Sequence, residues 1–137
     1  MSEPEVDWSA LEAAAHDART AAYAPYSNYQ VGAALLGEDG QVYPGANVEN
    51  ASYGLCLCAE RAASAKAINA GVRRFLALVV VTEGPRAAAP CGMCRQVLAE
   101  VGPSFPIRCV SATGDVLVTS VAELLPHAFD KGYLDDA

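Results

Sequence analysis

The feature that most constrains the fold is an uninterrupted apolar run of seven residues, 75–81. Half-buried strands alternate apolar and polar residues, whereas a strand without polar residues is typical of a sheet covered on both faces. Seven residues are also far short of the roughly 20 that a membrane-spanning helix requires. The run therefore predicts a central buried strand with helices on both sides of its sheet, and no membrane span.

The segments around this run alternate between helical and strand-like patterns. Apolar residues at helical spacing predict helices over 7–22, 58–70, 91–101 and 121–129. Short apolar segments that flank turn residues predict strands over 31–36, 41–43, 107–110 and 116–118. The order α-β-β-α-β-α-β-β-α predicts an α/β fold, with a mixed five-stranded sheet sandwiched between helices. A length of 137 residues is typical of a single domain, so we expect one domain over 1–137.

Charge and cysteine content narrow the possible functions. The chain has 9 basic and 16 acidic residues, a formal charge of −7, which disfavours nucleic acid and anionic membranes as partners and favours a small-molecule ligand. The first residues are acidic, unlike those of a secretory signal, so a cytoplasmic protein with reduced thiols is expected. Five cysteines are too few for a disulfide scaffold, which leaves metal binding, catalysis or core packing as their roles.

Three of these cysteines have the spacing of a metal site. Cys91 and Cys94 are three residues apart at the start of one predicted helix, and Cys58 is at the start of another. Helix N-termini carry partial positive charge and lower thiol pKa values, which favours the thiolates that zinc needs. Three protein ligands leave one tetrahedral position open for water, which is typical of a catalytic zinc site.

Glu60 is the candidate proton carrier of this site. It is two residues from Cys58, so the two side chains can face one ion only if Cys58 lies at the irregular entry to its helix. In that position the carboxylate would take a proton from the zinc-bound water and deliver it to a substrate.

Other interpretations of the cysteines remain open. Cys91 and Cys94 also fit a thioredoxin-like redox pair, or half of a structural zinc site with Cys56 or Cys109 as a fourth ligand. Neither alternative gives Glu60 a role. For Cys56 and Cys109 themselves, packing as small apolar side chains is the simpler expectation.

Five stretches in order give the chain a specific resemblance: 26–35 (YSNYQVGAAL), 47–53 (NVENASY), 58–62 (CAERA), 90–96 (PCGMCRQ) and 124–129 (LLPHAF). With these motifs the sequence resembles the small, single-domain cytidine deaminases, over about residues 20 to 130. The Cys-Ala-Glu and Pro-Cys-x-x-Cys stretches match the three-cysteine form of the zinc deaminase signature.

The resemblance implies a homotetramer with one zinc ion per subunit and active sites built partly from neighbouring chains. It implies that Asn47 and Glu49 hold the ribose hydroxyls. Tyr29, at a position where Phe is more usual, would line the base pocket, and backbone groups near Ala59 would orient the base. The same resemblance assigns Tyr53 and Phe129 to the sites of other subunits.

The implied reaction is zinc-dependent hydrolytic deamination of cytidine and 2′-deoxycytidine to uridine and 2′-deoxyuridine, with release of ammonia, as in pyrimidine salvage. The alternatives are a deaminase of a cytosine nucleoside antibiotic such as blasticidin S, and a non-catalytic module that zinc stabilises. Three thiolates would give the zinc cluster a formal charge of −1, so a nearby cation is expected. Arg61 and Arg95 are the candidates. The family match favours Arg61, whose guanidinium would donate hydrogen bonds to the sulfur ligands of the metal.

Overall fold

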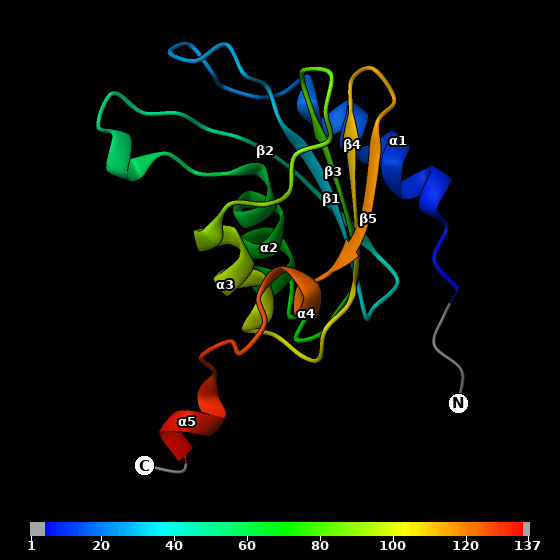
Figure 1. The fold of residues 1–137 in the computed structure, drawn as a ribbon, viewed down its shortest axis with the longest axis vertical. Coiled ribbons are helices and arrows are strands. Elements are labelled where there is room, and N and C mark those ends of the chain that lie inside the picture. Colours follow the sequence, from blue (N-terminus) through cyan, green and yellow to red (C-terminus); the bar gives the residue numbers. More distant parts are fainter. Residues whose placement is uncertain (1–4, 136–137) are drawn as a thin grey trace.

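The computed structural model describes residues 5–135 and contains one five-stranded sheet with helices on both of its faces (Figure 1). The strands are β1 (Gly32–Gly37), β2 (Val42–Ala46), β3 (Phe75–Thr82), β4 (Pro106–Ser111) and β5 (Val116–Ser120). The principal helices are α1 (Trp8–Arg19), α2 (Ala59–Asn69) and α3 (Gly92–Ala99). Three short elements complete the chain: the 3-10 turn η1 (Tyr53–Leu55), α4 (Val121–Leu124) and α5 (Lys131–Asp135).

The sheet is mixed, as predicted, with the strand order β2-β1-β3-β4-β5. β1 pairs antiparallel with both β2 and β3, and β4 pairs antiparallel with β5. β3 and β4 are parallel because the segment between them crosses back over the sheet through α3. Pro44 is tolerated in β2 because β2 is an edge strand, where the missing N–H breaks no interior ladder.

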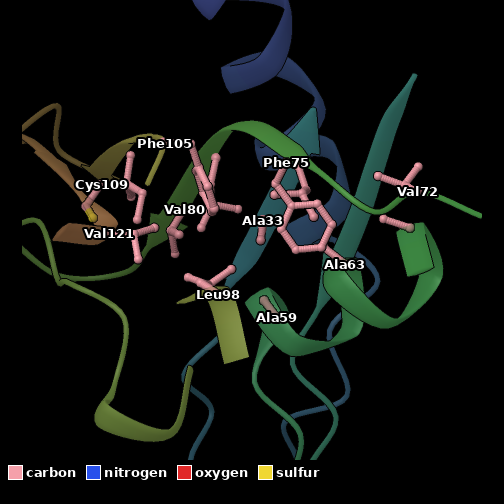
Figure 2. Close-up of a cluster of buried hydrophobic side chains, with 14 residues drawn as sticks. Ala33, Ala59, Ala63, Val72, Phe75, Val80, Leu98, Phe105, Cys109 and Val121 are labelled. Atoms are coloured by element: carbon pink, nitrogen blue, oxygen red, sulfur yellow. The ribbon is translucent and has the colours of Figure 1, made fainter. Parts of the chain in front are cut away.

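The central strand β3 is covered on both faces, which confirms the interpretation of the apolar run 75–81. Leu11 and Ala15 of α1 pack with Val79 and Val81 on one face. The larger core lies on the opposite face, between the sheet and the helices α2 and α3 (Figure 2). It contains three alanines of α2, Leu98 of α3 and the edge-to-face rings of Phe75 and Phe105, whose centroids are 5.9 Å apart.

Two glycines let the helices approach the sheet closely. A Cβ atom added to Gly45 of β2 would lie 2.6 Å from the Ala59 carbonyl oxygen and 2.5 Å from the Ala63 amide nitrogen, both in α2. One added to Gly32 of β1 would overlap the Ala15 carbonyl oxygen and lie 2.6 Å from the Arg19 amide nitrogen, both in α1. The backbones of α1 and α2 therefore rest directly on two glycines that face opposite sides of the sheet.

The C-terminal part differs from the sequence prediction. The helix predicted over 121–129 was wrong beyond residue 124, because α4 ends there and Leu125 leaves the helical region with φ −136° and ψ 69°. A residue that precedes proline is disfavoured in the helical region, and Pro126 follows Leu125. His127 then adopts a positive φ of 56°, and α5 begins only at Lys131.

The first helix ends earlier than the predicted residue 22. α1 stops at Arg19, after which the amides of Ala21 and Ala22 bond to carbonyls three residues back, as in a tightened final turn. Its predicted start is confirmed, since the Asp7 side chain accepts a hydrogen bond from the amide of Ala10 and caps the helix. Within residues 5–135, none of the helices has both the length and the apolar composition to cross a bilayer.

Candidate active site

Three thiols meet where the N-termini of α2 and α3 come together. Cys58 is the N-cap of α2 and Cys91 is the N-cap of α3, both with extended backbone, and Cys94 lies in the first turn of α3. The Sγ atoms of Cys58 and Cys91 are 3.8 Å apart, and those of Cys91 and Cys94 are 3.4 Å apart. The structure thus brings together the three cysteines that the spacing singled out.

The donor set fits a zinc ion. All three Sγ atoms lie within 4.8 Å of one another, close enough for one tetrahedral ion to contact each of them. Cys109 is fully buried in β4, and Cys56 lies apart from this group, with its Sγ 3.3 Å from the amide nitrogen of Asn50.

Hydrogen bonding between the thiols shifts the pKa values of Cys58 and Cys94 in opposite directions. The hydrogen bond to Cys94, with help from Arg61 and Cys91, lowers the pKa of Cys58 to about 5 against the opposing effect of burial. The same hydrogen bond raises the pKa of Cys94, since that thiol is then the donor. These contacts therefore favour the thiolate form of Cys58, which is the form that binds a metal cation.

The two candidate arginines occupy different environments. Arg61 Nη2 lies 3.5 Å from Cys58 Sγ and donates to the Cys56 carbonyl at 3.2 Å, and the bond to Cys58 raises the pKa of the guanidinium. Arg95 instead donates to the carbonyls of Pro90 and Leu124, at 2.8 and 3.0 Å. Of the two, Arg61 lies against the sulfur of Cys58, whereas Arg95 links the start of α3 to α4.

Glu60 lies in the first turn of α2, directly beside the thiols. Its side chain is only 5% exposed, and burial raises its pKa to about 7. Cys58 is at the extended entry to the helix, so the geometric condition for the two side chains to face the same point is met. A carboxyl group with a pKa near neutrality can both accept and donate a proton at physiological pH.

A cavity of about 360 Å³ opens over Glu60 and Cys58. Four of the residues that the resemblance assigned to substrate binding line it: Tyr29, Asn47, Glu49 and Ala59. The other two lie outside it. Tyr53 is 77% exposed and packs edge-on against Tyr26, and Phe129 is 58% exposed and stacks on Tyr133. Both residues are therefore exposed away from the cavity of their own chain, and their assignment to the sites of other subunits stays a prediction.

Asn47 and Glu49 are fixed by the segment 26–31. Asn47 Oδ1 accepts from the amide of Val31 at 2.9 Å, and its Nδ2 donates to the Tyr29 carbonyl at 2.8 Å. Glu49 Oε1 accepts from the amides of Tyr26 and Ser27 at 2.9 and 3.1 Å, and Oε2 accepts from the Ser27 hydroxyl. The hydrogen bond from Ser27, followed by those from the backbone amides, holds the pKa of Glu49 below its usual range.

Sequence reasoning missed two polar residues that line this cavity, Ser27 and Thr82. Ser27 is within the motif 26–35 and lines the cavity, yet its partner Glu49 is 22 residues away. Ser27 and Asn28 are residue types that favour turns, so the sequence could have predicted a turn here. In the structure the Tyr29 amide donates to Ser27 Oγ, two residues back. Thr82, at the end of β3, also lines the cavity and carried no recognisable pattern.

Comparison with known proteins places these features in context. The family model described as "Cytidine and deoxycytidylate deaminase zinc-binding region" matches residues 5–109. A cytidine deaminase from Sporosarcina psychrophila is 51% identical over 129 residues, which cover 92% of this chain and 93% of the relative. One from Halalkalibacterium halodurans is 50% identical over 120 residues, covering 87% and 91%.

Solved structures show the same likeness. The 1.6 Å crystal structure of cytidine deaminase from Burkholderia pseudomallei superposes with a TM-score of 0.86 at 54% identity. The match covers 90% of this chain and all of that one. The mixed five-stranded sheet with helices on both faces is therefore shared with this solved relative, and the predicted fold class is confirmed.

Proposed function

This chain belongs to the cytidine deaminase family, and we propose that its cavity hydrolyses the 4-amino group of cytidine and 2′-deoxycytidine. The products are uridine or 2′-deoxyuridine and ammonia. One observation carries the proposal: a buried carboxyl group, Glu60, lines the same cavity as Cys58, which belongs to a cluster of three thiols. A redox dithiol or a purely structural metal site would not require Glu60.

Cys58, Cys91 and Cys94 would hold one zinc ion per chain, in keeping with a family whose model describes a zinc-binding region. Zinc supplies Lewis-acid activation of the water that attacks C4 of the pyrimidine. Arg61 would partly balance the negative charge of the three thiolates, because its guanidinium donates a charge-assisted hydrogen bond to Cys58 Sγ.

Glu60 would move the protons. It would accept one proton from the attacking water and deliver it to N3 of the ring. It would then take the second proton from the new C4 hydroxyl and pass it to the departing amine, so that water and the C4 amine become a C4 carbonyl and ammonia. Its pKa of about 7 suits a group that must take up and release protons within one cycle.

Asn47 and Glu49 would bind the ribose hydroxyls. An amide has two N–H donors and an oxygen that can accept two hydrogen bonds, and Asn47 uses one of each within the protein, so one donor and one acceptor site stay available. Glu49 remains ionised because its pKa is lowered, and a carboxylate at the sugar repels a nearby phosphate. Tyr29 and the backbone at Ala59 would form the wall of the base pocket, so free nucleosides are the expected substrates.

We propose further that four copies assemble and complete one another's cavities. Tyr53 and Phe129 are large, exposed apolar side chains that lie outside the cavity of their own chain. Contact with a neighbouring cavity would bury both. Analytical ultracentrifugation should then give the mass of a tetramer. Tyr53→Ala should raise the KM for cytidine even when the variant stays assembled.

The whole chain, 1–137, would act as one deaminase domain in the cytoplasm and serve pyrimidine salvage. All five cysteines are free, the state that thiolate ligands require and that a reducing compartment maintains. A bacterial strain that cannot make uridylate should grow on cytidine when it expresses this chain. Failure to grow despite soluble expression would contradict the salvage role.

The decisive experiment compares Glu60→Gln with the wild-type protein. Because glutamine cannot carry protons, the variant should keep its zinc but lose about 10²–10⁴-fold in kcat for cytidine. Metal analysis and ammonia release measure the two quantities. Deoxycytidine, cytidine 5′-monophosphate and blasticidin S, tested alongside, define the substrate class. A zinc-replete Glu60→Gln protein with a normal rate would eliminate the proposed role.

A further inference from the structure

The segment 26–31 lines the cavity without forming a helix or a strand. Ser27, Tyr29 and Val31 contribute to the cavity wall, and between them Asn28 adopts a left-handed backbone conformation with φ 58°. A short irregular segment of this kind keeps its shape only where side chains and neighbouring backbone hold it.

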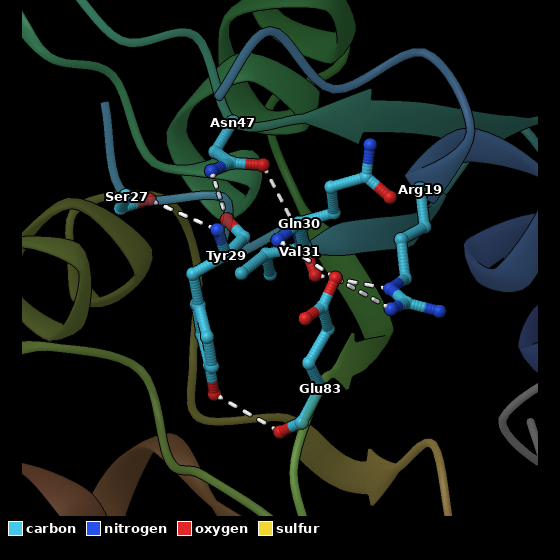
Figure 3. A network of polar contacts seen from close by, with 7 residues as sticks. All are labelled: Arg19, Ser27, Tyr29, Gln30, Val31, Asn47 and Glu83. Atoms are coloured by element: carbon cyan, nitrogen blue, oxygen red, sulfur yellow. Dashed lines mark hydrogen bonds and ion pairs between the residues drawn. The ribbon is translucent and has the colours of Figure 1, made fainter. Parts of the chain in front are cut away.

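The cavity side of this segment is held by Asn47 and Glu49, as described above. Asn47 bonds to the Tyr29 carbonyl and the Val31 amide, so the position of the segment and the orientation of the Asn47 amide are coupled (Figure 3). If the segment shifts, the donor and acceptor that Asn47 presents to a ligand shift with it.

The opposite side is held by an ion pair between the end of α1 and the residue after β3. Arg19 Nη2 lies 2.8 Å from Glu83 Oε1, and the side chains are 24% and 34% exposed. Both groups also bind the backbone of Gln30: Arg19 Nε donates to its carbonyl at 3.0 Å, and its amide donates to Glu83 Oε1 at 3.3 Å. Figure 3 shows the pair and the Gln30 peptide groups meeting at one point.

Glu83 also reaches the aromatic ring of the cavity wall. The Tyr29 hydroxyl donates to the Glu83 backbone carbonyl at 3.3 Å. Tyr29 is thus fixed at both ends, through its main chain by Asn47 and Ser27 and through its hydroxyl by Glu83.

We propose that Arg19 and Glu83 are positioning residues for nucleoside binding: their ion pair clamps Gln30 and so sets the places of Tyr29 and Asn47 in the cavity. This inference rests on the proposed function, because it takes those two residues to contact the base and the ribose. An ion pair that only joined α1 to the sheet would not explain why Arg19 also binds the Gln30 carbonyl and Glu83 also binds the Gln30 amide.

The test measures kcat, KM for cytidine and zinc content in Arg19→Met, Glu83→Ala and the double variant. Methionine keeps most of the apolar stem of Arg19 and removes its donors. Each single variant should raise KM on the order of tenfold, the size expected for one lost charge-assisted hydrogen bond, and should leave kcat within about twofold and zinc content unchanged. Because the two residues act as one unit, the double variant should be no worse than the weaker-binding single variant.

Conservative variants and a matched control separate positioning from general stability. Glu83→Gln keeps an oxygen that can accept from Arg19 and Gln30, so it should restore most of the affinity lost in Glu83→Ala. Glu12→Ala removes the exposed partner of His16, 3.8 Å away on the same helix, and should leave KM unchanged.

Two outcomes would overturn the inference: a lower melting temperature with an unchanged KM, or a double variant whose KM increase is the product of the two single increases. Asn47→Ala distinguishes this failure from that of the proposed function. If Asn47→Ala raises KM while the Arg19 and Glu83 variants do not, the ribose site stands and the clamp is wrong. If Asn47→Ala also leaves KM unchanged, the proposed nucleoside site is itself wrong.

Discussion

Gly45→Ala should displace the active site without touching any of its side chains. The new Cβ would lie 2.5 Å from the Ala63 amide nitrogen and 2.6 Å from the Ala59 carbonyl oxygen, whereas ordinary contacts begin near 3.4 Å. Because the neighbouring atoms belong to the backbone, α2 must move away from the sheet by about 0.9 Å to relieve the closer overlap. Cys58 is the N-cap of α2 and Glu60 lies in its first turn, so both would be displaced relative to Cys91 and Cys94 of α3.

A misplacement of about 1 Å at a reacting group can reduce the rate roughly 10²-fold, and overpacking typically costs about 1–3 kcal/mol of stability. We therefore expect Gly45→Ala to lower kcat for cytidine by about one to two orders of magnitude and to weaken zinc retention. Steady-state kinetics, metal analysis and urea unfolding measure the three effects.

Gly32→Ala is the matched control, because it forces an overlap at least as severe on the opposite face of the sheet, against α1. It should reduce the free energy of unfolding at least as much as Gly45→Ala but leave kcat and zinc content close to wild type. If both variants lost kcat in proportion to their loss of stability, displacement of α2 would not be the cause. A normal kcat in Gly45→Ala would refute the reasoning outright.

Three further substitutions test single contacts. Arg61→Ala should raise the zinc dissociation constant about 10–100-fold in a chelator competition, because the guanidinium no longer balances the thiolate at Cys58; unchanged affinity would show that this charge is balanced elsewhere. Ser27→Ala removes the main cause of the lowered Glu49 pKa. A carboxyl group whose pKa is lowered in the folded protein stabilises the fold at pH values above its unfolded pKa of about 4.3. This stabilisation is lost as the pH falls through the pKa of the folded state. Ser27→Ala should therefore lower the melting temperature more at pH 7 than at pH 3. An equal loss at both pH values would contradict this assignment. Cys109→Ala should keep its zinc and lose on the order of 1 kcal/mol in urea unfolding, because burial raises the pKa of Cys109 to about 12 and keeps it an uncharged core side chain; loss of the metal would instead make it a ligand.

The parts of this molecule that sequence predicts are those with local causes. The apolar run 75–81 specifies a doubly covered strand through the chemistry of its own residues, and the Cys91–Cys94 spacing places two sulfurs on one helical turn whatever surrounds them. The end of α4 has an equally local cause in Pro126, and the prediction of a helix to residue 129 failed by neglecting it.

The support of the cavity could not be found in this way. Ser27 and Glu49 are 22 residues apart, and the Tyr29 hydroxyl and Glu83 carbonyl are 54 apart. Their meeting depends on the register of β1 against β3 and on where α1 ends, which no short stretch of sequence encodes. Charged residues such as Arg19 also look alike in sequence, whether they face water or hold a peptide group in place.

The meeting of two helix starts at one metal site also bears on the unfolded chain. Cys58 and Cys91 are 33 positions apart, and the stretch between them contains α2 and the central strand β3. By the loop-closure relation used for disulfides, a cross-link over this sequence separation lowers the conformational entropy of the unfolded chain and so stabilises the fold by roughly 3–4 kcal/mol. A metal ion held by these thiols would then act as a reversible cross-link between α2 and α3. Loss of the metal would remove the activity and the stabilising cross-link together.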